Sequence, residues 1–155
     1  MTDNKPKLMI RCYPEKNEIT LDDGNRYVTY PCSAANMKQC CRILDEIING
    51  ACSHIDFADL PAPSDMSRPI LYRETVAESR DTLPDDAERL YASADELHDA
   101  NCVLTFMELS PDVDPVTVNK ARKHIFNYAD NSTVIIWTST FTRDASCRIS
   151  LIGIF

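Results

Sequence analysis

Two carboxylates lie three residues apart in the short segment 55–60, which reads Ile-Asp-Phe-Ala-Asp-Leu. Two carboxylates so close together can hold and orient a water molecule. The ordinary alternative is that Asp56 and Asp59 are solvated loop acids, or that one of them caps the next segment, because acidic residues are common in exposed loops.

A second pattern, Cys-x-His-x-Asp, overlaps the first and is formed by Cys52, His54 and Asp56. These residue types bind zinc, but a structural zinc site usually has four ligands. Alternating residues also point the same way only in an extended segment. We therefore expect no metal; these three residues are the ones that would hold it, and a polar loop histidine is the simpler interpretation.

The cysteine pattern favours thiols over disulfides. The chain has seven cysteines, an odd number, and no Cys-x-x-Cys pair. Cys40 and Cys41 are adjacent in a predicted helix, where they are interpreted as core thiols. The pattern predicts reduced, mostly buried cysteines in a cytoplasmic protein.

A helix is predicted to deliver the acidic segment. Ser33 is a suitable N-cap, and Asn49-Gly50 is a stop signal at which glycine would adopt the left-handed conformation. Apolar residues recur between them at offsets of three and four, which places them on one helix face. These residues are Met37, Cys40, Cys41, Leu44, Ile47 and Ile48.

Residues 1–32 are predicted to form a β-meander that lies against this helix. Strands are expected at 8–13, 18–21 and 26–30, and Asp22-Asp23-Gly24-Asn25 is a hairpin signal. The helix and acidic loop at 33–60 form the second expected segment of the chain.

Residues 66–155 are predicted to form the third segment, an α+β domain with a mixed four-stranded sheet and two helices on one face. Strands are expected at 69–75, 102–107, 133–141 and 147–155, and helices begin at Pro84 and after Asp114-Pro115. We expect the second helix to bury Ala121 and Ile125. The turn at 143–146 predicts that the last two strands are antiparallel neighbours.

The totals exclude several classes of protein. The net charge of −8 argues against a nucleic-acid partner, which requires a basic surface. No stretch approaches the roughly 20 apolar residues of a membrane span, and the first residues lack the apolar core of a signal peptide. We therefore expect no nucleic acid and no membrane as partners, and one core or two small lobes.

Three places in the chain resemble the C-terminal half of the tubulin-like cell-division GTPase FtsZ. The helix running into segment 55–60 is similar to the family's central helix and its catalytic synergy loop, Asn-x-Asp-Phe-Ala-Asp. Residues 129–139 are similar to a helix end and strand of the family, and residues 148–155 to its closing strand. With their spacing, the resemblance covers roughly residues 34–155.

The resemblance implies a role for the acids of segment 55–60. In FtsZ these carboxylates enter the nucleotide pocket of the neighbouring subunit and polarise the attacking water, so Asp56 and Asp59 become candidate synergy-loop acids. Binding would involve His54, Asp56, Phe57 and Asp59, with His54 standing where the family has asparagine. The glycines that the family carries near Tyr72–Arg80 are missing.

The family's GTPase half, with its glycine-rich phosphate loop, is also missing. The chain has three glycines in all, so we expect no nucleotide cofactor and no enzyme activity by the chain alone. The resemblance implies a non-enzymatic protein that docks on a tubulin-like GTPase or on itself. The alternatives are a self-associating structural or small-ligand-binding module and an enzyme that uses the 52–59 cluster.

Overall fold

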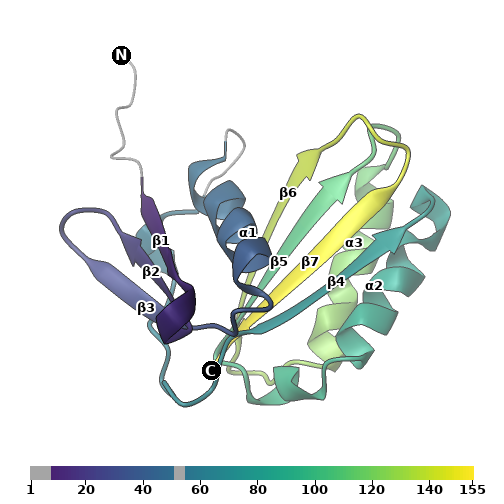
Figure 1. Ribbon diagram of the computed structural model, residues 1–155. Helices are drawn as coiled ribbons and strands as arrows, with labels where there is room; N and C mark the ends of the chain where they lie inside the picture. Colours follow the sequence, from purple (N-terminus) through teal and green to yellow (C-terminus); the bar gives the residue numbers. More distant parts are fainter. Residues whose placement is uncertain (1–7, 51–54) are drawn as a thin grey trace. The chain divides into compact units, whose positions relative to one another are not determined.

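The computed structural model describes residues 8–50 and 55–155. The chain divides into two compact units, Met1–Ile70 and Leu71–Phe155, and each is described by itself. Figure 1 shows the elements along the chain.

The first unit contains a three-stranded antiparallel meander, as the alternating sequence predicts. Its strands are β1 (Met9–Tyr13), β2 (Glu18–Asp22) and β3 (Tyr27–Pro31), in the order β1-β2-β3. A short 3-10 turn at Pro14–Lys16 joins the first two. At the β2–β3 turn the Asp22 carboxylate accepts from the Gly24 amide at 2.8 Å, and Gly24 has φ of +90°, so the hairpin signal is confirmed.

Helix α1 (Met37–Asn49) follows the meander and begins later than the sequence predicts. Its N-cap is Asn36, because residues 34–36 form a turn before the helix. Ser33 is therefore not the cap. The periodic apolar face is largely confirmed, but Ile43 belongs to it, whereas Cys41 and Ile48 are only half-buried. The buried helix residues are Met37, Cys40, Ile43, Leu44 and Ile47.

Gly50 ends α1 for a different reason from the expected one. Its φ is −64°, which is not the left-handed conformation, and its amide donates to the Glu46 carbonyl at 3.1 Å. A Cβ at this position would lie 2.3 Å from that same carbonyl oxygen. The glycine is required by this close approach of the backbone and not by a positive φ.

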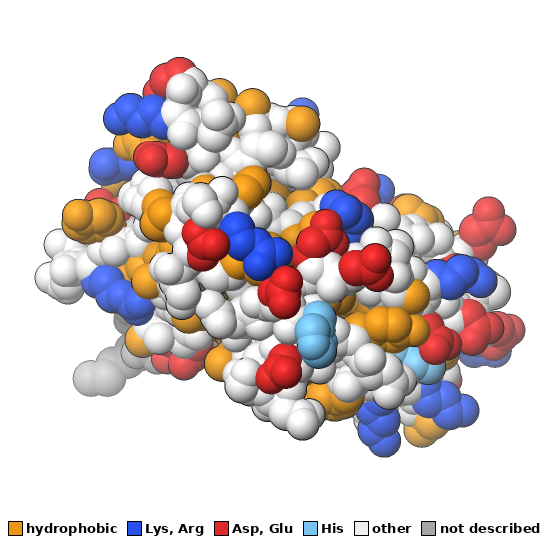
Figure 2. Space-filling view, turned by 90° about the horizontal axis from the view of Figure 1, so that it is seen from below, with side chains coloured by type: hydrophobic (Ala, Val, Ile, Leu, Met, Phe, Trp, Pro, Cys, Tyr) orange, Lys and Arg blue, Asp and Glu red, His pale blue; other side chains and the backbone are white. Residues whose placement is uncertain are grey.

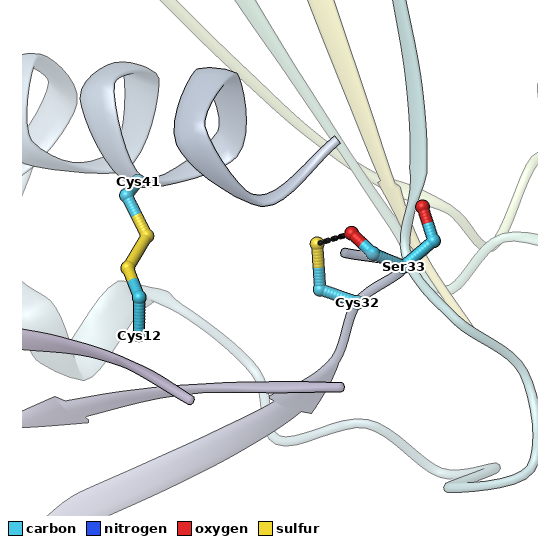
Figure 3. The surroundings of a disulfide bond; sticks show 4 residues. All are labelled: Cys12, Cys32, Ser33 and Cys41. Atoms are coloured by element: carbon cyan, nitrogen blue, oxygen red, sulfur yellow. Dashed lines mark hydrogen bonds between the residues drawn. A yellow bond between two sulfur atoms is a disulfide. The ribbon is translucent and has the colours of Figure 1, made fainter. Parts of the chain in front are cut away.

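A disulfide joins Cys12 of β1 to Cys41 of α1 and contradicts the prediction of reduced thiols at these positions (Figure 3). Cys40 and Cys41 are adjacent, so they lie on different sides of the helix: Cys40 is fully buried, while Cys41 faces the outer strand. The other cysteines that the structure describes are free and buried, namely Cys32, Cys40, Cys102 and Cys147.

The second unit is a mixed four-stranded sheet with two helices on one face, as predicted (Figure 1). The strand order is β4-β7-β5-β6, in which only β5 and β6 are parallel. Its strands and helices are β4 (Leu71–Ala77), α2 (Leu83–Ala92), β5 (Cys102–Leu109), α3 (Pro115–Lys123), β6 (Val134–Phe141) and β7 (Cys147–Ile154). Short 3-10 turns occur at Arg80–Thr82, Asp95–Asp99 and His124–Asn127.

The core of this unit lies between the sheet and its two helices. Ala121 and Ile125 are fully buried there, as predicted, together with Leu151 and Ile149 of β7. At the start of α3 the Asp114 carboxylate accepts from the Thr117 amide at 2.8 Å, which confirms the predicted N-cap. This hydrogen bond holds the pKa of Asp114 below its usual value.

The predicted pairing of the last two strands is wrong. β6 and β7 belong to the same sheet, but β5 lies between them. The β5–α3–β6 segment is a crossover that places β6 parallel to β5 on one side. β7 is almost continuously apolar and buried, so it takes an inner position between β4 and β5. Residues 143–146 therefore connect two strands that are not neighbours.

Candidate functional site

The acidic loop, residues 55–60, has the alternation that its sequence predicts. A 3-10 turn spans Phe57–Asp59. Phe57 and Leu60 are buried, at 8% and 0% exposure, while Asp56 and Asp59 are exposed. The apolar side chains therefore anchor the loop and the two carboxylates face solvent.

Hydrogen bonds inside the acidic loop give Asp59 a structural task. Its carboxylate accepts from the Asp56 amide at 3.0 Å, while its own amide donates to the Asp56 carbonyl at 2.9 Å. The Leu60 amide donates to the Phe57 carbonyl at 3.1 Å and closes the turn. The capping interpretation therefore holds for Asp59. Its hydrogen bond to the Asp56 amide holds the Asp59 carboxylate against the start of the turn.

Side chains from the meander hold the acidic loop from outside. The Arg26 guanidinium donates to the carbonyls of Phe57 at 3.5 Å and Leu60 at 3.3 Å, and its central carbon lies 5.0 Å from the centre of the Phe57 ring. The Tyr30 hydroxyl donates to the Pro61 carbonyl at 2.8 Å. The carbonyls of Leu60 and Pro61 thereby gain partners from outside the loop, and the Phe57 carbonyl, which already accepts from the Leu60 amide, gains a second donor.

Arg26 and Tyr30 are positioning residues that sequence reasoning missed. They lie 31 residues or more before their partners in the chain. No local pattern marks such a contact, because an arginine beside a turn and a tyrosine in a strand are both ordinary. Only the folded first unit brings them to the loop.

Two of the predicted site residues, Cys52 and His54, lie outside the described residues. The proposed Cys-x-His-x-Asp pattern is therefore not described as a unit. Within residues 8–50 and 55–155, no group of three or more His, Cys, Asp or Glu side chains is arranged to hold a metal ion.

The charged surface is mixed. Figure 2 shows acidic and basic side chains interspersed on one face, in a chain of net charge −8. No helix in the described part of the chain is long and apolar enough to cross a membrane.

No protein-family model and no curated protein matches the chain. Solved structures do match. An FtsZ structure from M. jannaschii, an empty dimer, aligns with a TM-score of 0.58 at 16% identity over 78% of this chain. The W319Y mutant of M. jannaschii FtsZ gives 0.59 at 16% identity over 76%. A TubZ-Bt four-stranded filament gives 0.53 at 15% identity over 77%.

The chain has the fold of a partial FtsZ/tubulin-like domain. It covers 39%, 40% and 34% of those three chains, so it spans well under half of each. At such low identity the likeness concerns the fold, since one fold supports many functions.

Proposed function

We propose that this protein acts by protein–protein interaction, docking on a tubulin-like filament in cell division through its acidic loop. The observation that carries the proposal is the pair of exposed acids on a fixed loop, in a chain with an FtsZ-like fold. Arg26, Phe57 and Leu60 hold the backbone of that loop, so little entropy is lost when it meets a partner.

Asp56 and Asp59 would approach the terminal phosphate of a nucleotide held by the partner. There they would orient the attacking water, which is a large part of phosphoryl-transfer catalysis. The partner would supply the nucleotide and the phosphate loop. The chain itself contributes carboxylates and a docking surface.

The compartment that we propose is the cytoplasm. Cys32, Cys40, Cys102 and Cys147 are free thiols, which suits a reducing compartment. The Cys12–Cys41 disulfide is the exception among the described cysteines.

By itself the chain should neither bind nor hydrolyse GTP, since its three glycines include no phosphate loop. Titration calorimetry with GTP and Mg²⁺ tests this expectation. Saturable binding in the micromolar range would contradict it and favour the enzyme interpretation.

The main experiment measures GTP turnover and assembly of an FtsZ-like GTPase from the same organism, with and without this protein. The wild type should change both. Asp56→Asn with Asp59→Asn should still bind filaments but lose its effect on turnover, because asparagine retains an oxygen for the Asp56 amide but has no charge. Phe57→Ala should disorder the loop and lose both effects.

A matched control removes two exposed acids of the first unit outside the loop, Glu15→Ala with Glu46→Ala. It changes the net charge equally and should behave like the wild type. If wild type and the Asp56/Asp59 variant both leave turnover and assembly unchanged, the filament proposal is wrong.

A further inference from the structure

The four-stranded sheet of the second unit has two edge strands of different character, β4 and β6. β4 includes Arg73 and Glu74, the kind of charges with which proteins protect an edge. β6 reads Val-Ile-Ile-Trp-Thr-Ser-Thr-Phe and contains no charge, proline or glycine. A long, uncharged edge strand of β-branched and aromatic residues is a template for pairing with another strand.

The hydrogen bonds of β6 show which backbone groups point outward. The amides of Val134 and Thr142 donate to β5-side carbonyls at 2.9 and 2.8 Å. In a parallel ladder the residues alternate, so the even-numbered positions face β5 and the odd-numbered ones face the outer side of β6, where no strand pairs within residues 8–50 and 55–155. The residues with outward amides and carbonyls are Ile135, Trp137, Ser139 and Phe141.

These four outward residues are placed symmetrically about Thr138. We propose that β6 pairs antiparallel with β6 of a second copy of this chain, across a two-fold axis at Thr138. Ile135 then lies opposite Phe141, and Trp137 opposite Ser139. A two-fold axis perpendicular to the sheet keeps the helices of both copies on the same face, so each opposite pair has its side chains on one side.

A second copy suits this edge better than an unrelated partner of charged character. The chain carries a net charge of −8, yet β6 contains no charged residue. Pairing of two β6 strands therefore places no like charges opposite one another. Val134 and Phe141 at the ends of the strand are 50% and 69% exposed, and in this register Phe141 is covered by Ile135 of the other copy. The edge is thus self-complementary in hydrogen bonding and in apolar contact.

The pairing supplies about eight main-chain hydrogen bonds by the rule for an antiparallel ladder. One strand pair buries less than the roughly 1,600 Å² of a standard interface. The dimer should therefore be reversible, with a dissociation constant in the micromolar range. This association does not depend on docking to a filament.

The test is sedimentation velocity of the full chain from about 1 to about 200 µM, which spans the expected constant. Trp137 is the single tryptophan and lies on β6, so its fluorescence should change over the same range. Phe141→Lys should weaken the dimer about tenfold or more. Val76→Lys on β4 replaces an exposed apolar side chain at the other edge of the sheet, where Val76 is 49% exposed. It should change the dissociation constant by less than about twofold.

A mixing experiment tests the register. Thr138 lies opposite Thr138 of the second copy, across the two-fold axis. Thr138→Lys and Thr138→Glu should therefore each weaken self-association, because each places like charges opposite one another. An equimolar mixture of the two variants should restore association as a heterodimer. Ser139→Pro removes an outward amide and leaves the amides that bond β5 in place, so it should also weaken the dimer while the thermal unfolding remains cooperative.

A wild type that remains monomeric at the highest concentration overturns the proposal. So does equal weakening by Phe141→Lys and Val76→Lys, which would place the contact elsewhere. Loss of association in Thr138→Lys without recovery in the mixture overturns the two-fold register.

Discussion

The two units of this protein are stabilised by different kinds of contact. The second unit packs two helices on a four-stranded sheet around a continuous apolar core. In its described residues the first unit has three short strands and one α-helix, and specific links tie these elements together. Cys12 is bonded to Cys41, Asn49 exchanges two hydrogen bonds with the Leu8 backbone, and Arg26 holds the acidic loop.

The difference lies in the added links and not in the absence of a core. The first unit also has fully buried apolar side chains, among them Ile19, Leu21 and Ile47, but a three-stranded meander gains little stability from its strands alone. The disulfide and the hydrogen bonds of Arg26 and Asn49 add to that core. They also hold the acidic loop at the surface with a defined backbone.

The largest expected effect is in the core of the second unit. Leu151→Ala should lower the free energy of unfolding of this unit by about 4 kcal/mol, since the side chain is fully buried and leaves a cavity. Hydrogen exchange resolved by peptide should show faster exchange across β5 and β7. Val76→Ala, at an exposed position, should cost less than about 0.5 kcal/mol; equal costs would contradict the importance of this core.

Breaking the disulfide should have the next largest effect. Cys12→Ser should destabilise the first unit by about 3 kcal/mol. The bond closes a loop between residues 29 positions apart, and without it the unfolded chain gains conformational entropy. Wild type with a dithiol reductant should show the same loss, while the reductant should add nothing to Cys12→Ser. Exchange in the second unit should stay unchanged, and a loss confined to that unit would contradict the comparison.

Arg26→Ala should have a smaller effect, about 1 kcal/mol, through loss of its contact with the Phe57 ring and of two hydrogen bonds to loop carbonyls. Limited proteolysis should then cut near residues 55–60 more readily. Arg26→Lys retains the charge but not the planar fork, so it should recover only part of the protection. Full recovery would show that charge alone holds the loop.

The smallest expected effect concerns pH. The pKa of Asp114 is depressed by the amide and hydroxyl of Thr117. Its ionised form therefore stabilises α3 above the ordinary pKa of about 4, and this contribution is lost as the pH falls through the lower folded pKa. Asp114→Asn should show a weaker fall in stability between about pH 4 and pH 2 in urea unfolding; an unchanged acid profile would contradict this role.

Local features of the fold were predictable from the sequence. The alternation in 18–31, the Asp-Asp-Gly-Asn turn and the Asp114-Pro115 helix start all depend on contacts within a few residues. The acidic loop belongs to the same class, because the burial of Phe57 and Leu60 and the exposure of the neighbouring Asp56 and Asp59 follow from residue type alone. The FtsZ-like fold was expected from three such local patterns and their order along the chain, namely segment 55–60 with its preceding helix, residues 129–139 and residues 148–155.

Tertiary structure decided what depends on distant residues. The apolar run of β7 predicts a strand. Its position between β4 and β5 depends on which strands pair with it on its two sides. The Cys12–Cys41 bond and the grip of Arg26 on Phe57 join residues about thirty positions apart. Sequence spacing limits neither, because a contact across a loop of that length is one of very many that the unfolded chain could form, and packing selects it.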